Sequence, residues 1–128
     1  MSALALAVTA ALADSLPKGQ SANFALAAER AQMEPRYRKI GLGLDFEGVT
    51  PNRHFYTWIV VPSVGEGVDY LAVDRRTGDV WAYLACKRLR SPELAALQAR
   101  FRRRYHVPES LVRQIEKAGS PTTGCGPN

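Results

Sequence analysis

The stretch Val68–Cys86, VDYLAVDRRTGDVWAYLAC, most constrains the fold, because it has the pattern of a β-hairpin. Apolar-rich runs flank a polar centre, Asp74–Asp79, and aromatic and β-branched residues at a spacing of two suit a pleated strand. Gly78 lies near the end of that centre, where a glycine takes the positive φ of a bulged turn without a steric penalty. The stretch therefore predicts two antiparallel strands joined by a short turn.

Two more strands are predicted before this hairpin. Leu42, Leu44 and Phe46 alternate with glycine and acidic residues. The run His54–Val61, HFYTWIVV, is largely apolar on both faces, which favours a central strand that is covered in part on each side. Together with the hairpin, these segments predict a meander of four antiparallel strands.

Helices are predicted on both sides of the meander. Residues 21–40 have a helical composition, with Ser21 as the capping residue and a break just before Pro35, since proline disrupts a helix interior. Ser91–Glu93 combines a capping serine, a proline at the first position and an acid, and Glu109–Lys117 follows as a last helix. The predicted fold class is α+β: an N-terminal helix packed on a four-stranded antiparallel meander, followed by two C-terminal helices.

The length of 128 residues predicts one domain, residues 21–128, behind an N-terminal segment of different character. Met1–Asp14 is rich in alanine and leucine and ends in the small-x-small run Ala11-Leu12-Ala13, as secretory signal peptides do. No basic residue precedes Lys18, so an ordinary N-terminus is the alternative. The apolar run is too short to span a membrane. Residues 1–20 are therefore predicted as a signal-peptide-like segment with a linker, and the protein as periplasmic or secreted.

The two cysteines give a second indication of the compartment. Cys86 ends the hairpin, and Cys125 lies in a tail rich in glycine and proline. In an oxidising compartment a Cys86–Cys125 disulfide would tie that tail to the domain, which in the chain-entropy model is worth about 3–4 kcal/mol. Two free thiols in a cytosolic protein are the alternative.

The chain carries a net charge of +5 and a sequence pI near 9.6. Much of the excess lies between Lys87 and Arg104, around the predicted helix that begins at Ser91. Cations near a helix C-terminus are favoured by its dipole, but four arginines exceed that need. They suit either a solvated surface, phosphates, or an acidic cleft of another protein.

No pattern of catalytic chemistry is present in the sequence. It shows no nucleophile–base pair, no phosphate-binding glycine loop and no cluster of metal-ligand residues, and His54 and His106 are isolated from each other. We therefore predict no catalytic residue, no cofactor and no metal. His54 beside Tyr56 on one strand face is the place where a site would be sought.

The turn signature Tyr-x-x-x-Asp-x-x-Thr-Gly-x-Val resembles cystatin-like and PepSY-type domains. It consists here of Tyr70, Asp74, Thr77, Gly78 and Val80. The longer pattern, which looks like small exported bacterial proteins, continues through Trp81, Cys86, Leu94, Leu97 and Gln98. That group includes immunity proteins that protect against secreted antibacterial toxins. The resemblance covers about two-thirds of the chain and implies a fold and a binding role, without any catalytic residue.

The leading hypothesis is a non-enzymatic periplasmic binding protein, of the immunity type that blocks a secreted toxin or a wall-acting enzyme. Exposed arginines and aromatic residues are the usual anchors of tight interfaces. The candidate contacts are Arg53, His54, Trp58, Arg75, Arg76, Asp79 and Trp81. For the two tryptophans, a place in the core is the alternative.

Two other classes of function remain open at this stage. A small enzyme or ligand carrier would hold His54, Tyr56 or Asp69 in a pocket between helix and sheet, with a perturbed pKa. A basic nucleic-acid binder would show affinity that falls steeply with salt, but the aromatic residues of the arginine-rich helix lie on its apolar stripe. A protein partner is therefore favoured over nucleic acid.

Overall fold

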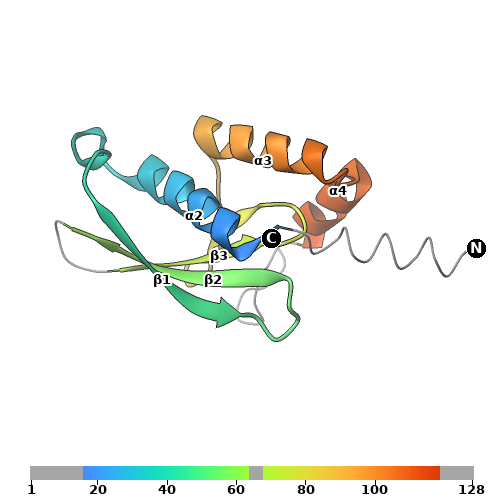
Figure 1. Ribbon diagram of the computed structural model, residues 1–128, viewed down its shortest axis with the longest axis horizontal. Helices are drawn as coiled ribbons and strands as arrows, with labels where there is room; N and C mark the ends of the chain where they lie inside the picture. The colour runs from blue at the N-terminus through green and yellow to red at the C-terminus, as the bar shows by residue number, and fades with distance from the viewer. Residues whose placement is uncertain (1–15, 64–67, 119–128) are drawn as a thin grey trace, which may run out of the picture.

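The computed structural model describes residues 16–63 and 68–118 of the chain (Figure 1). Within these residues it is an α+β structure with one antiparallel sheet. The elements, in chain order, are α2 (Lys18–Gln32), the short 3-10 helix η1 (Pro35–Tyr37), β1 (Leu42–Val49), β2 (Phe55–Pro62), β3 (Asp69–Asp74), β4 (Val80–Ala82), β5 (Lys87–Leu89), α3 (Pro92–Arg104) and α4 (Glu109–Ala118).

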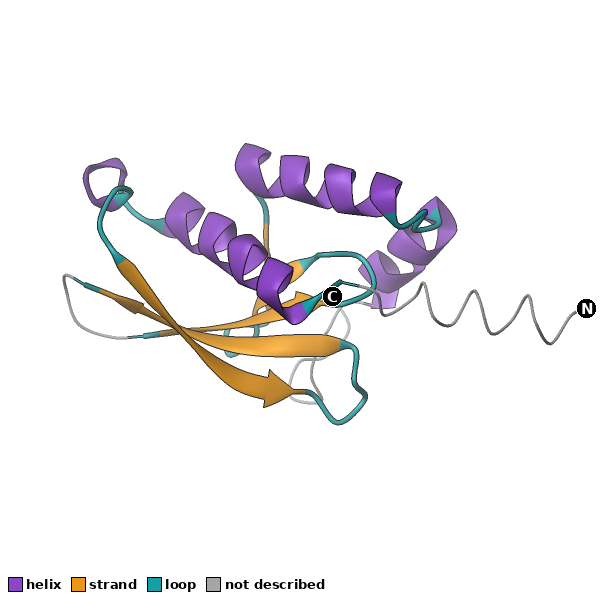
Figure 2. Cartoon of the chain, viewed as in Figure 1, coloured by secondary structure: helices purple, strands orange, loops and turns teal. Residues whose placement is uncertain are grey.

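The five strands lie in the sheet in their chain order, so each pairs with the strand that follows it. All four pairings are antiparallel. Helices α2 and α3 lie together over one face of this sheet and run in opposite directions (Figures 1 and 2). The result is two layers, helices on a twisted sheet, with the main core between them.

Strand β1 is one open edge of the sheet and contains an irregularity. Its pairing with β2 shifts by one residue between Phe46 and Gly48. Glu47 lies at the shift, and its Oε1 accepts a 2.6 Å hydrogen bond from the Tyr83 hydroxyl, beyond the end of β4. Burial and the Glu47 carboxylate raise the pKa of Tyr83 above its usual value.

The main core lies where small residues of α2 meet large residues of the sheet. Phe24, Ala25 and Ala28 of α2 are buried against Trp58 and Val60 of β2. Because alanine is small, the helix axis can lie close to the sheet. The aromatic side chains of β2 then fill most of the space between helix and sheet. Burying large aromatic side chains removes the most apolar area per residue and dominates core stability.

A second, smaller cluster lies on the opposite face of the sheet. It consists of Phe55, Ala72 and Trp81, with Tyr83 packed against it. Because side chains alternate along a strand, these residues face away from α2 and α3. The sequence expectation of a β2 that is covered in part on both faces is thus confirmed.

The sequence prediction was wrong about the number of strands. Five are present, because Lys87–Leu89 pairs with β4 as an additional strand. The strand after the hairpin turn ends at Ala82, and the chain turns back between Tyr83 and Cys86, where Cys86 has a φ of 54°. A three-residue strand that begins with lysine and arginine has no apolar alternation from which it could be recognised.

The helix boundaries were predicted in part. Helix α2 begins at Lys18, with Pro17 in the N-cap position, so Ser21 is a buried residue inside the helix and not its cap. The break before Pro35 is confirmed, with Pro35 starting a separate 3-10 turn. Ser91 caps α3 as predicted, since its Oγ accepts a hydrogen bond from the Leu94 backbone N–H at 3.1 Å.

Two sequence predictions lie outside the described residues. The signal-peptide-like run Met1–Asp14 is one, and the position of Cys125 is the other. The Cys86–Cys125 disulfide and the export of the protein therefore stay predictions.

Candidate protein-interaction site

Two segments that the sequence analysis proposed as contacts lie side by side at one end of the sheet. The Arg75 backbone N–H donates to the His54 carbonyl at 2.7 Å, and Arg75 Nη1 donates to the Arg53 carbonyl at 2.8 Å. The link before β2 and the turn after β3 thus form one surface, which we call the arginine tip: Arg53, His54, Arg75 and Arg76. The sequence had named all four residues, but not that they meet.

The backbone of the arginine tip is held in a strained conformation. Arg53 has a φ of 64°, in the left-handed region that residues other than glycine, asparagine and aspartate rarely adopt. Such a residue costs about 1–3 kcal/mol and persists only where its surroundings enforce it. The Arg53 N–H donates to the Thr50 carbonyl at 2.8 Å, and the Asn52 side chain accepts from the His54 N–H at 3.0 Å. These bonds fix the backbone at Arg53, whose side chain is exposed.

The Arg75 guanidinium lies over the ring of Tyr56, with 4.9 Å between its carbon and the ring centroid. Its Nε is buried and has no hydrogen-bond partner among the described residues. Neither Arg53 nor Arg75 forms an ion pair with a carboxylate within residues 16–63 and 68–118. Two uncompensated cations on a fixed backbone suit an acidic or hydrogen-bond-accepting partner.

The neighbouring hairpin turn is rigid for a different reason. Arg76 binds the buried Asp74 carboxylate through Nε and Nη2, at 3.1 Å and 3.0 Å, and its backbone N–H also donates to Asp74 Oδ1. Burial raises the pKa of the Asp74 carboxyl above its usual value, while the hydrogen bonds and charge of Arg76 oppose that rise. The positive charge of Arg76 is paired with the carboxylate of Asp74. We therefore expect Arg76 to contribute less than Arg53 to the binding of a partner.

Asp79, also proposed as a contact, holds the turn against α3. Its Oδ1 accepts from Arg102 Nη2 at 3.1 Å, and its Oδ2 accepts from the Thr77 hydroxyl at 2.8 Å. Arg102 Nε also donates to the Thr77 carbonyl, and Gln98 donates to the Gly78 carbonyl. Asp79 is buried, and its carboxylate joins the hairpin to the helix; its role as a partner contact stays a prediction.

The two tryptophans are core residues. Trp58 is 7% exposed and Trp81 is 2% exposed, so neither is the exposed anchor that the sequence analysis named as a candidate contact, and the alternative of a place in the core holds for both. Trp58 packs under α2, while Trp81 belongs to the smaller cluster on the other face. Alternation along the strands could not decide between these cases, since it does not show how far each face is covered.

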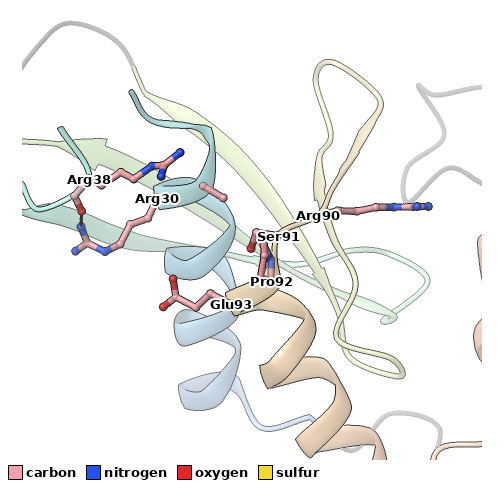
Figure 3. A pocket seen from close by; sticks show the side chains of 7 residues that line it. Arg30, Arg38, Arg90, Ser91, Pro92 and Glu93 are labelled. Atoms are coloured by element: carbon pink, nitrogen blue, oxygen red, sulfur yellow. Dashed lines mark hydrogen bonds between the residues drawn. The ribbon is translucent and has the colours of Figure 1, made fainter. Parts of the chain in front are cut away.

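A hollow lies where the C-terminal end of α2 meets the start of α3 (Figure 3). Its volume is about 490 Å³. It is lined by Arg30, Ala31, Arg38, Arg90, Ser91, Pro92 and Glu93. Arg30 and Arg38 lie on the same side of it, whereas the Arg90 side chain extends away from them (Figure 3). The hollow is therefore cationic on its α2 side.

A carboxyl pair lies elsewhere between α2 and the sheet. Glu29 of α2 is 3% exposed, and its side chain is hydrogen-bonded to Asp69 of β3. Burial, followed by the hydrogen bond and charge of Asp69, raises the pKa of Glu29 from 4.5 to about 8. Neither carboxyl is among the residues that line the hollow beside Arg30.

Within the described part of the chain, no group of three or more His, Cys, Asp or Glu side chains could hold a metal ion. None of the described helices is both long enough and apolar enough to cross a membrane.

No protein-family model and no curated protein matches the chain. One chain of a solved structure, described as a type VI secretion system effector–immunity complex from Pseudomonas protegens, is similar to it with a TM-score of 0.56. The two are 21% identical, and the match covers 80% of this chain and 87% of the other. The likeness shows the fold. The resemblance to cystatin-like and PepSY-type domains stays a prediction.

Sequence reasoning missed the hollow beside α2. It had assigned Arg30, Arg36, Arg38 and Lys39 to a solvated surface. The break at Pro35 turns the chain back, so that Arg38 comes to lie beside Arg30, whose Nη1 donates to the Arg38 carbonyl at 2.6 Å. The signal was the proline itself, because a chain reversal at Pro35 can bring Arg38, eight residues after Arg30, next to it.

Proposed function

We propose that the protein is a non-enzymatic, immunity-type inhibitor that binds a secreted bacterial effector and blocks it. The observation that carries the proposal is the fold shared with a chain of an effector–immunity complex. A binding protein needs a fixed surface more than reactive groups, and the arginine tip is such a surface.

The proposal places Arg53 and Arg75 among the contacts with the effector. Neither cation has a carboxylate partner among the residues that the structure describes, and the backbone beneath them is fixed by hydrogen bonds. Contacts that are already ordered lose less conformational entropy on binding. The proposal also places the protein in the periplasm or outside the cell, which rests on the Met1–Asp14 run and the predicted Cys86–Cys125 disulfide.

The test is neutralisation of a candidate secreted effector, sought first among the genes beside this one. That effector, directed to the periplasm of a bacterial host, should arrest growth, and co-expression of this chain with an export signal should restore it. The two purified proteins should elute together in size-exclusion chromatography. An Arg53→Glu/Arg75→Glu variant should weaken the complex by about tenfold or more, since truncating or reversing contact charges typically has effects of this size.

The matched control is Lys87→Glu/Lys117→Glu, which changes the net charge equally at exposed positions away from the tip. This control should protect the host as the wild type does. If the wild-type chain neither binds nor neutralises any neighbouring effector, the proposed function is wrong. If the chain protects only without an export signal, the periplasmic location is wrong.

A further inference from the structure

The helical layer, formed by α2 and α3, has a large excess of positive charge. Eight cations on these helices and their flanking segments form no ion pair with a carboxylate of the described chain: Lys18, Arg30, Arg38, Lys39, Arg90, Arg100, Arg103 and Arg104. The carboxylates in the same segments are fewer. Glu34 is paired with Arg36, Glu29 is buried, and Glu93 remains. A surface of one sign attracts and orients a partner of the other sign.

The cations lie around two hollows at opposite ends of the helical layer. The first is the one beside Arg30 and Arg38. The second has a volume of about 280 Å³ and is lined by Arg100 and Arg104 of α3, together with the N-terminal part of α2. The two helices run in opposite directions (Figure 1). Each hollow therefore lies between the start of one helix and the end of the other.

The two arginines at the first hollow are already oriented. Arg30 Nη1 donates to the carbonyls of Arg38 and Ile40, at 2.6 Å and 3.1 Å. Arg38 Nε donates to the Met33 carbonyl at 3.2 Å. These bonds use one nitrogen of each guanidinium and leave the others for an incoming group. A guanidinium that is fixed in this way can bind a carboxylate with less loss of side-chain entropy.

The surroundings favour a protein partner over nucleic acid. Non-specific nucleic-acid binding combines cations with exposed aromatic rings on which bases stack. Here Phe24 and Phe101 are buried, and the Arg104 guanidinium lies over the ring of the half-buried Tyr105 at 5.9 Å. The helical layer thus offers guanidinium groups without a stacking platform, which suits carboxylates.

We propose that the helical layer is a docking surface for an acidic segment of a protein partner, with carboxylates bound near Arg38 at one end and near Arg100 at the other. The identity of that partner as an effector rests on the proposed function. A helix of 13 residues is about 20 Å long, and six extended residues reach about as far. A hexaglutamate peptide is therefore a suitable probe.

The experiment is a titration of the full chain with a labelled hexaglutamate peptide at low ionic strength, followed by fluorescence anisotropy. Arg38→Glu/Arg100→Glu should weaken binding by about tenfold, because each reversal removes one attraction and adds one repulsion. Lys87→Glu/Lys117→Glu, with the same net charge, should weaken it by less than about twofold. Glu93→Gln should strengthen it, since it removes the carboxylate that lines the first hollow.

Circular dichroism shows whether each variant is folded, and Arg100→Glu alone is a second variant, at an exposed residue whose side chain forms no hydrogen bond in the described chain. Three results would overturn the proposal: no binding by the wild type, equal weakening in both charge reversals, or tighter binding of a thymidine hexanucleotide than of the peptide. Each of these leaves neutralisation of an effector untouched. Conversely, peptide binding that behaves as expected beside a neutralisation test that fails would reject only the proposed function.

Discussion

The indole Nε1 of Trp58 donates a 3.0 Å hydrogen bond to Ser21 Oγ across the buried boundary between β2 and α2. The Ser21 hydroxyl in turn donates to the Lys18 carbonyl at 2.6 Å. Nearby, the Tyr56 hydroxyl donates to the Leu16 carbonyl at 2.9 Å. Polar bonds therefore fix the position of α2 along the sheet, where an alanine-rich helix face alone would allow it to slide.

Replacing Ser21 by alanine should destabilise the fold by about 1–3 kcal/mol, because the buried Trp58 N–H then has no acceptor. The change is measured as a lower midpoint of urea unfolding, followed by tryptophan fluorescence. Ser110→Ala, at an exposed position in α4, is the control and should have an effect below about 0.5 kcal/mol. Equal effects of the two substitutions would contradict the role given to this bond.

The Glu29 carboxyl predicts how stability depends on pH. Its pKa in the folded state, about 8, is above the ordinary 4.5, so between these values the folded state keeps a proton that the unfolded state has lost. The free energy of unfolding should therefore fall as the pH rises from about 4.5 to about 8, by up to about 1.4 kcal/mol per pH unit, and then level off. Glu29→Gln should remove this slope, as measured by urea unfolding at several pH values. The exposed Glu109→Gln should retain it.

The contact between α3 and the hairpin turn depends on one arginine among several. Arg102→Met should destabilise the fold by about 1–3 kcal/mol, because the Asp79 carboxylate and the Thr77 carbonyl lose their donor. Arg103→Met, at the next and exposed residue, should be nearly neutral. Thermal unfolding followed by circular dichroism distinguishes the two, and a similar melting temperature for both variants would show that the pair is unimportant.

Replacing either of two glycines by alanine should change the stability of the fold, in opposite directions. Gly78 has a φ of 80°, and a Cβ there would lie 2.6 Å from Phe24 Cε2, so Gly78→Ala should destabilise by more than about 1 kcal/mol. Gly19 lies in the first turn of α2 with nothing within 4 Å of its added Cβ. Gly19→Ala should stabilise by up to about 1 kcal/mol, since alanine favours the helix. Chemical denaturation of both variants measures whether the free energy of unfolding falls for Gly78→Ala and rises for Gly19→Ala.

The cysteine prediction can be tested on the purified, exported chain. If Cys86 and Cys125 are joined, a thiol reagent should label no cysteine in denaturant before reduction and two after it. Reduction should also lower the free energy of unfolding by about 3–4 kcal/mol in the chain-entropy model. Two labelled cysteines before reduction would disprove the disulfide.

The sequence predicts the parts of the fold that depend on local chemistry. Pro35 breaks the helix because it cannot continue the hydrogen-bond ladder, and Ser91 starts the next helix because its hydroxyl satisfies a free N–H. Strand β5 was missed because its residues pair only after Cys86 adopts a positive φ, which no local preference of cysteine indicates. That part of the fold depends on tertiary contacts.

The candidate site was predictable to a smaller extent. Arg53 and Arg75 could be named as exposed cations, but 22 positions separate them, and only the pairing of β2 with β3 brings them together. Arg102 could have been recognised as a residue that contacts the hairpin turn. It lies four residues after Gln98 and so on the same helix face, and Gln98 also binds the turn. Arg102 stands in a run with Arg103 and Arg104, and the sequence does not show which of the three points toward the sheet.

The shifted pairing near Phe46 also affects how copies of the chain meet at high concentration. Because β1 is irregular at this point, its outer rim cannot offer a second molecule an even ladder of hydrogen-bonding groups along its whole length. Asp45 and Glu47 would also approach their own counterparts if two such rims joined, and like charges repel. The irregular pairing and the two acidic residues therefore protect the open edge strand β1 against edge-to-edge aggregation into fibrils.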